Sequence, residues 1–206
     1  MKYDAVIFDL DGTLWDALEV SAEAWTKGFK DNNIQKTVTA DDLRSVVGKP
    51  FIECLERISP DIAKVCPGII ESIDYHEKRV IDEFGGKIYD GAAEIISELS
   101  AVTQVFIVSN CDDWYLEAFF RHSELQRYMA GYDCFGMSRV SKSLMLKNMT
   151  GVNNLVNPVY IGDTHSDFEA AQEANADFIF AEYGFGVLDQ ECMRIKNPTD
   201  LRKVLF

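Results

Sequence analysis

The sequence lacks paired cysteines and long apolar runs. Its five cysteines are odd in number and scattered, with no CxxC pair, so they indicate reduced thiols rather than a disulfide framework or a zinc site. No apolar run approaches the roughly 20 residues that span a bilayer. The N-terminal stretch MKYDAVIFDLDG carries carboxylates through its apolar part, which excludes a secretory signal there. From these absences we expect a cytoplasmic protein with no membrane partner.

Basic residues are also scarce. The chain has 20 Lys and Arg against 34 Asp and Glu, which gives a formal net charge of -14. Nucleic acids and anionic membrane surfaces are bound through clusters of Lys and Arg, so we expect neither as a partner. An anionic substrate would need local cations or a metal ion to overcome this acidic background.

What the sequence does have is a set of short apolar runs typical of buried parallel strands. Continuous Val, Ile and Phe cover residues 5–9, 105–109 and 159–163, with a weaker run at 178–181. Segments with helical periodicity lie between them, at 92–100, 112–122 and 166–176. This alternation predicts an α/β fold with a Rossmann-like, three-layer core built on a parallel sheet.

The region of residues 15–87 breaks the alternation. It has almost no strand-like run, and its pattern predicts four helices, at residues 15–32, 41–47, 50–58 and 67–84. We therefore predict two domains: an α/β core formed by residues 1–14 and 88–206, and an inserted all-helical domain of residues 15–87. We call the latter the helical insert.

Polar residues suited to chemistry follow three of the predicted strands. FDLDGT at 8–13, VSN at 108–110 and IGDTHSD at 161–167 all continue past an apolar run. Because the carboxyl ends of parallel strands open on one edge of a sheet, these residues should converge there. Several carboxylates in one cleft repel each other unless a cation joins them, and oxygen ligands without His or Cys favour Mg²⁺.

These motifs resemble those of the haloacid dehalogenase superfamily, in the branch of phosphoglycolate phosphatases and β-phosphoglucomutases with a helical cap. DLDGT at 9–13 matches the first family motif, IVSN at 107–110 the second and GDTHSD at 162–167 the fourth. YDGAAEIISEL at 89–99 resembles the segment that returns from cap to core, although Asp90 stands where proline is common. The resemblance spans nearly the whole chain.

The resemblance implies roles for the carboxylates. Asp9 would be the nucleophile that forms an aspartyl-phosphate, and Asp11 would protonate the leaving alcohol and then activate water. Gly12 would allow the turn that brings both side chains to one phosphate. The Mg²⁺ ligands would be Asp9, the backbone carbonyl of Asp11 and Asp163, and Asp167 would either be a further ligand or hold a metal-bound water.

The resemblance also implies phosphate-binding residues, namely Thr13, Ser109, Asn110 and Lys142. Lys142 is the least certain by pattern, because the proline that often follows this lysine is absent and Lys147 is a rival. VVGKP at 46–50 resembles a loop that touches substrate in relatives, so Lys49 is a candidate substrate contact.

The function that follows is a Mg²⁺-dependent phosphatase that hydrolyses a small phosphorylated metabolite through an aspartyl-phosphate on Asp9. A phosphomutase of the β-phosphoglucomutase type is the first alternative, since it shares these motifs. A non-catalytic phosphate-binding protein is a second, and a dehalogenase is a weaker third. The motifs select neither the substrate nor an oligomeric state, monomer or homodimer.

Overall fold

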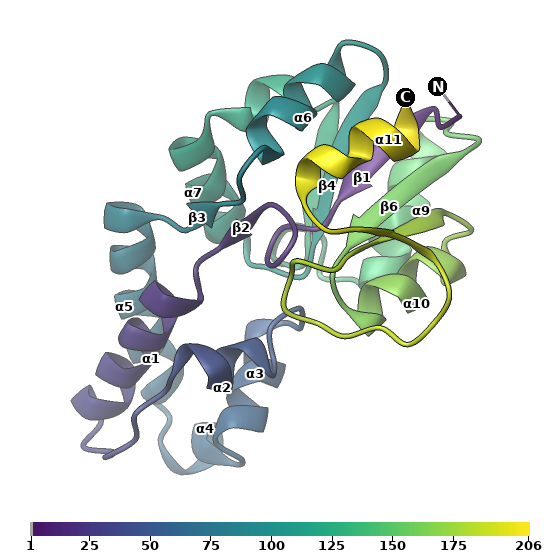
Figure 1. Ribbon diagram of the computed structural model, residues 1–206. Coiled ribbons are helices and arrows are strands. Elements are labelled where there is room, and N and C mark those ends of the chain that lie inside the picture. Colours follow the sequence, from purple (N-terminus) through teal and green to yellow (C-terminus); the bar gives the residue numbers. More distant parts are fainter. Residues whose placement is uncertain (1) are drawn as a thin grey trace.

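One parallel sheet forms the centre of the protein (Figure 1). The computed structural model describes residues 2–206. The sheet has six strands in the order β5-β4-β1-β6-β7-β8, and every neighbouring pair is parallel. The strands are β1 (Ala5–Phe8), β4 (Gln104–Ser109), β5 (Gly131–Cys134), β6 (Pro158–Gly162), β7 (Asp177–Ala181) and β8 (Met193–Ile195).

Helices cover both faces of this sheet. Alternate residues of β1 point to opposite sides, so Val6 and Phe8 join one apolar cluster while Ala5 and Ile7 join another. On the first side the cluster includes side chains of α6 (Ala92–Ser100), α7 (Asp113–Ser123) and α11 (Leu201–Leu205). On the second it includes those of α9 (Lys142–Val152) and α10 (His165–Glu173). The predicted Rossmann-like, three-layer α/β fold is confirmed.

Five helices lie between the first strand and the rest of the core. They are α1 (Leu18–Asp31), α2 (Ala40–Arg44), α3 (Phe51–Ile58), α4 (Ile62–Val65) and α5 (Ile69–Phe84). They pack around an apolar cluster of their own that includes Trp25, Phe29 and Ile73. Helices α1 and α5 approach closely at Gly28, where a Cβ would lie 2.5 Å from Cγ1 of Ile73. Figure 1 shows these helices beside the sheet and not stacked on it.

A short antiparallel ribbon joins the insert to the core. It pairs β2 (Trp15–Asp16) with β3 (Lys87–Ile88). The sequence had predicted a helix from residue 15, but Trp15 pairs with Ile88, and Asp16 Oδ1 accepts a hydrogen bond from the Leu18 amide, so the helix begins at Leu18. The division into two domains at residues 15 and 87 stays a prediction.

The remaining elements are short. Helix α8 covers Phe135–Ser138, and 3₁₀ turns cover Leu125–Tyr128 and Pro198–Asp200. Across residues 2–206, none of the helices has the length and apolar character needed to cross a bilayer.

Candidate active site

The carboxyl ends of the central strands bring Asp9 and Asp163 together. Strands β1 and β6 pair in parallel with Phe8 opposite Ile161, and the Asp9 amide donates to the Ile161 carbonyl over 2.8 Å. Each aspartate is the first residue beyond its strand. The strand register therefore puts the two carboxylates side by side, at the edge where ligands bind in sheets of this kind.

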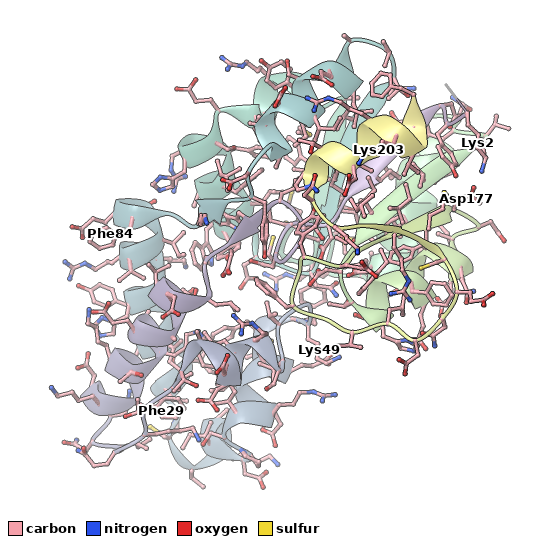
Figure 2. All side chains as sticks on the ribbon, in the orientation of Figure 1. Lys2, Phe29, Lys49, Phe84, Asp177 and Lys203 are labelled. Carbon is pink, nitrogen blue, oxygen red and sulfur yellow. The ribbon has the colours of Figure 1, made fainter. Side chains whose placement is uncertain are left out.

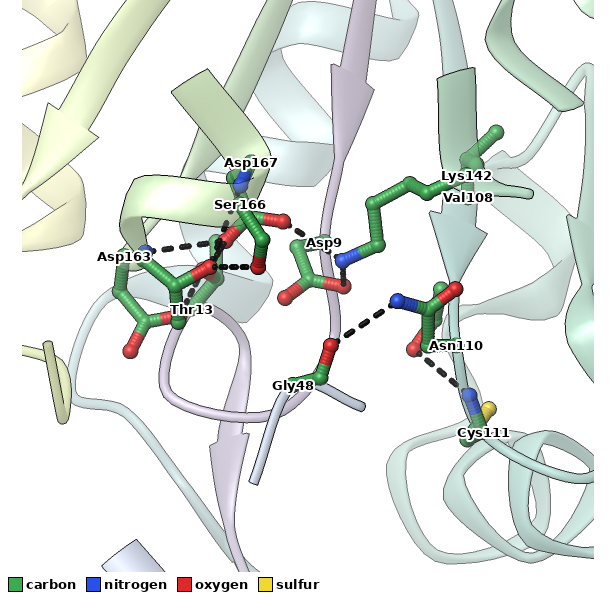
Figure 3. Close-up of polar contacts among 12 residues, drawn as sticks. Asp9, Thr13, Gly48, Val108, Asn110, Cys111, Lys142, Asp163, Ser166 and Asp167 are labelled. Atoms are coloured by element: carbon green, nitrogen blue, oxygen red, sulfur yellow. Dashed lines mark hydrogen bonds and ion pairs between the residues drawn. The ribbon is translucent and has the colours of Figure 1, made fainter. Parts of the chain in front are cut away.

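Asp167 reaches the same point from the first turn of α10. Thr164 caps this helix, since its side chain accepts from the Asp167 amide over 3.2 Å. In return, Asp167 Oδ2 accepts from the Thr164 amide over 2.9 Å and from its hydroxyl over 2.6 Å. This capping box fixes the carboxylate through Oδ2. Its second oxygen, Oδ1, takes no part in the cap and contacts Lys142 instead (Figure 3).

One lysine joins these carboxylates. Lys142 Nζ lies 2.9 Å from Asp9 Oδ1 and 2.6 Å from Asp167 Oδ1. Oxygens of Asp9, Asp163 and Asp167 all lie within 4.8 Å of one another. All four side chains are buried, and the alternative lysine, Lys147, is exposed on the outer side of α9. Two of these carboxylates thus share one ammonium group away from water, and the third, Asp163, lies beside them.

The electrostatics of this cluster favour a further cation. Burial raises the pKa of Asp9 to about 7, against the opposing effect of Lys142, and burial also raises the pKa of Asp163 well above its usual value. Burial lowers the pKa of Lys142, but the charges of Asp167 and Asp9 outweigh this and raise it. The charge of Asp167 also raises both carboxylate pKa values, so the carboxylates repel one another in addition to being desolvated. The donor set, all oxygen with no His or Cys, fits Mg²⁺.

A loop after β7 holds Asp163 in place. The Phe185 amide donates to Asp163 Oδ2 over 2.7 Å, and the Thr13 hydroxyl donates to Oδ1 over 3.4 Å. The backbone approaches closely here, since a Cβ on Gly184 would lie 2.3 Å from the Cβ of Asp163. No motif in the sequence marked this contact between the loop at residues 183–186 and the carboxylate.

Asp11 is not among the three clustered carboxylates and has a different partner. Gly12, with a positive φ of 76°, permits the turn, and Asp11 Oδ1 accepts a hydrogen bond from the Tyr115 hydroxyl over 2.7 Å. Burial raises the pKa of Asp11 to about 6, although the Tyr115 hydrogen bond lowers it. No motif marked Tyr115 in advance, because it is one apolar-face residue of α7 among several.

The other predicted phosphate ligands lie around this cluster, with different partners. Ser109 is buried at the end of β4, and its Oγ accepts from the Cys111 amide over 3.3 Å. Asn110 Nδ2 donates to the Gly48 carbonyl of the helical insert over 2.9 Å (Figure 3). Thr13 is directed at Asp163, as described above. Asn110 therefore links the two parts of the chain directly.

Lys49 is not part of the carboxylate cluster. It lines an open cavity between the core and the helical insert. Figure 2 shows Lys49 where the insert meets the core. Asp11 lines the same cavity. The predicted site residues thus divide between a buried polar cluster and a cavity next to it, with Asp11 at the boundary.

Comparison with known proteins agrees with this geometry. The family model described as haloacid dehalogenase-like hydrolase matches residues 6–181. A 5'-nucleotidase from Pseudomonas aeruginosa is 23% identical over 208 aligned positions, which cover 97% of this chain and 90% of that protein.

Solved structures share the whole fold. The crystal structure of a predicted phosphoglycolate phosphatase from Haemophilus somnus has a TM-score of 0.86 at 16% identity, covering 100% of this chain and 99% of that one. A predicted phosphatase from Clostridium acetobutylicum has a TM-score of 0.84 at 21% identity, with the same coverage. At these identities the likeness shows the fold. The family match confirms the predicted superfamily and, with it, the prediction of an enzyme: the chain belongs to the haloacid dehalogenase-like hydrolase family.

Proposed function

We propose that this hydrolase is a Mg²⁺-dependent phosphatase that acts on a small phosphorylated metabolite through an aspartyl-phosphate on Asp9. The observation that carries the proposal is the buried cluster in which oxygens of Asp9, Asp163 and Asp167 lie within 4.8 Å of one another, with Lys142 paired to Asp9 and Asp167. The names of the similar proteins, a 5'-nucleotidase and two predicted phosphatases, support phosphate esters as the substrate class.

The metal would be held by Asp9, Asp163 and the backbone carbonyl of Asp11, with Asp167 as a further ligand or as the acceptor for a bound water. When bound there, Mg²⁺ would neutralise excess negative charge and polarise the phosphoryl group. Lys142 adds a fixed positive charge beside Asp9, 2.9 Å from its Oδ1. Together they reduce the repulsion between a carboxylate nucleophile and a phosphate dianion.

In the first step a carboxylate oxygen of Asp9 bonds to phosphorus, and the bond from phosphorus to the ester oxygen breaks. Asp11 gives its proton to that oxygen, so the alcohol leaves neutral. A pKa of about 6 for Asp11 suits this task, because about a tenth of the carboxyl groups is protonated at pH 7, far more than at the ordinary pKa of 3.8. The Tyr115 hydroxyl, 2.7 Å from Oδ1, fixes the orientation of this group.

In the second step Asp11, now a carboxylate, accepts a proton from a water molecule. The water oxygen bonds to phosphorus, and the bond to Asp9 breaks, which releases inorganic phosphate and restores both aspartates. The same two residues thus act in both halves of the reaction.

Thr13, Ser109 and Asn110 would complete the phosphate site. Thr13 and Ser109 each have a hydroxyl that can rotate toward a phosphoryl oxygen. Asn110 would contact the phosphate while its amide donates to the Gly48 carbonyl. Phosphate binding and the position of the helical insert would thereby be coupled. We propose that this insert, residues 15–87, acts as a cap that excludes water during the transfer.

The test is phosphate release from a panel of phosphorylated metabolites, with Mg²⁺ and with EDTA, by the wild type and by Asp9→Asn. We expect Mg²⁺-dependent release that is lost in Asp9→Asn and kept in Glu173→Gln, an exposed carboxylate on α10. Interconversion of sugar phosphates without release would indicate a phosphomutase. No release from any compound, by a folded protein that binds Mg²⁺, would contradict the proposal.

A further inference from the structure

The cavity between the core and the helical insert has mainly apolar walls. Aromatic side chains come from both parts of the chain: Trp25 and Phe51 from the insert, with ring centroids 5.2 Å apart, and Trp114 from the core. The cavity also reaches Asp11, the proposed proton donor to the leaving alcohol. The alcohol part of a phosphate ester bound at Asp9 would therefore extend into this cavity.

One buried carboxylate stands among these apolar walls. Glu77 of α5 lines the cavity, is 9% exposed, and accepts a hydrogen bond from the Trp25 indole over 3.2 Å. No ion pair of Glu77 occurs among residues 2–206. Burial raises its pKa to about 7. A carboxylate that is buried without a cation is costly, so this position favours a ligand that brings positive charge.

The other acidic residues of the cavity already have partners or roles. Asp74 pairs with Lys78 over 2.8 Å, and Asp112 lies 3.8 Å from Arg139. Asp11 is assigned to proton transfer. Of the acidic groups in the cavity, Glu77 is the one left to recognise a substrate.

The aromatic walls are also suited to a cation. Lys78 Nζ already lies 5.4 Å from the ring centroid of Trp114, so this wall binds an ammonium group at one position. A cation within the cavity would gain similar contacts with the faces of aromatic rings, beside the carboxylate of Glu77.

Lys49 argues for the opposite choice, an anionic leaving group such as a carboxylate. However, Lys49 is only half-buried, and its long side chain can extend its charge toward water. Glu77 has no such freedom, because burial and the indole hydrogen bond hold it in place. Glu77 is therefore the fixed acidic group with which a cation in the cavity can pair.

We propose that the cavity binds the alcohol part of the substrate, and that this alcohol carries an ammonium group that pairs with Glu77 and packs against the aromatic walls. The substrate would then be the phosphate ester of an amino alcohol. This inference rests on the proposed function and specifies its substrate class.

The test compares two esters of the same shape: phosphocholine, and neohexyl phosphate, in which carbon replaces the ammonium nitrogen. We expect kcat/KM to be about tenfold or more higher for phosphocholine, as for a cation held by aromatic faces and a carboxylate. Phosphoglycolate, a nucleoside monophosphate and p-nitrophenyl phosphate complete the panel. The inference would be overturned if kcat/KM for phosphocholine did not exceed that for neohexyl phosphate. It would also be overturned if phosphoglycolate or the nucleoside monophosphate had a higher kcat/KM than phosphocholine.

Variants connect the preference to its residues. In Glu77→Gln the preference for phosphocholine over neohexyl phosphate should fall to near one, while Glu71→Gln, exposed on the same helix, should keep it. Lys49→Met should raise the preference, and a fall would overturn the inference in favour of an anionic leaving group. If Glu77→Gln does not fold by circular dichroism, the wild-type preference and Lys49→Met decide.

If the proposed phosphatase function is wrong, the result differs from a failure of the cation site. In that case none of the esters, p-nitrophenyl phosphate included, would be hydrolysed. Binding of choline and of neohexanol, followed by tryptophan fluorescence, would then decide the inference alone. Tighter binding of choline supports a cation site, and equal or weaker binding overturns it.

Discussion

The core and the helical insert bury ionisable side chains in opposite ways. At the sheet edge, Asp9, Asp163 and Asp167 lie close together with Lys142 paired to Asp9 and Asp167, and strands, a helix cap and a loop hold them in place. In the insert, Glu77 is buried in a mainly apolar cavity without an ion pair among residues 2–206, and hydrogen bonds from the Trp25 indole and from Ser21 stabilise it.

This difference separates two tasks. A dense polar cluster can stabilise the charge of phosphoryl transfer for any ester, because it acts on the phosphate that all of them share. A single buried charge in an apolar cavity can distinguish one alcohol from another. We therefore expect changes in the core to abolish catalysis and changes in the insert to alter which substrate is used.

The largest effect should come from Asp11, at the boundary of the two regions. Asp11→Asn removes the proton donor and acceptor, so turnover should fall by a factor of about 10²–10⁴. With p-nitrophenyl phosphate, whose leaving group needs little protonation, the first step should continue and the phosphorylated enzyme should accumulate. Rapid-quench kinetics measure the turnover rate and the amount of phosphorylated enzyme, and Asp113→Asn, an exposed aspartate, is the control. Unchanged turnover would remove Asp11 from the mechanism.

The next largest effect concerns stability in the core. Lys142→Met leaves three buried carboxylates without their ammonium, so in EDTA the free energy of unfolding should fall by about 3–5 kcal/mol. Mg²⁺ should restore part of it, because a cation that binds only the folded state stabilises that state. The matched control is the exposed Lys147→Met, with an expected change within about 0.5 kcal/mol in urea unfolding. Equal effects of both variants would show that the cluster is not electrostatically coupled.

Glu77 of the insert should make the free energy of unfolding depend on pH. Burial raises the pKa of Glu77 from 4.5 to about 7, so between these values the folded protein keeps a proton that the unfolded chain has lost. The contribution of Glu77 to the free energy of unfolding is therefore fully present below the lower value and is lost as pH rises through about 7.

Glu77→Gln removes this dependence. At about pH 8 we expect the variant to be more stable than the wild type by about 2 kcal/mol, with little difference at acidic pH. The exposed Glu71→Gln should follow the wild type at every pH. If the difference in the free energy of unfolding between wild type and Glu77→Gln stays the same at every pH, Glu77 is not a buried carboxylate without a cation.

The smallest effect should come from the contact between the two regions. Asn110→Ala removes the hydrogen bond to the Gly48 carbonyl, worth about 1 kcal/mol, so KM should rise about fivefold. The exposed Asn148→Ala serves as control. Inhibition by inorganic phosphate separates the two proposed roles, because weaker phosphate binding would mark Asn110 as a phosphate ligand as well. An unchanged KM would mean that the contact does not influence closure.

The sequence predicted the parts of the fold that have strong local patterns. The continuous apolar runs of β1, β4, β6 and β7 were found almost to the residue, as were helices α6 and α7. Strands β5 and β8 were missed because GYDC and MRI are short edge segments without an apolar run. Trp15 was read as helical because its pairing with Ile88 is far away in the sequence.

The candidate site divides in the same way. Asp9, Asp163 and Asp167 could be named from the sequence because parallel strands must deliver their carboxyl ends to one edge. Contacts that depend on packing could not be named, such as Tyr115 with Asp11 or the Phe185 amide with Asp163. Glu77 was missed for the same reason, since a glutamate on an amphipathic helix is ordinarily exposed.

The central claim is that Asp9 carries the phosphoryl group. The most direct measurement is an acid quench of the wild type and Asp11→Asn during turnover of p-nitrophenyl phosphate with Mg²⁺, followed by peptide mass spectrometry. We predict one phosphoryl group, on the peptide that contains Asp9, in larger yield in Asp11→Asn. A phosphoryl group on another residue, or phosphate release by Asp9→Asn at the wild-type rate, would contradict the mechanism.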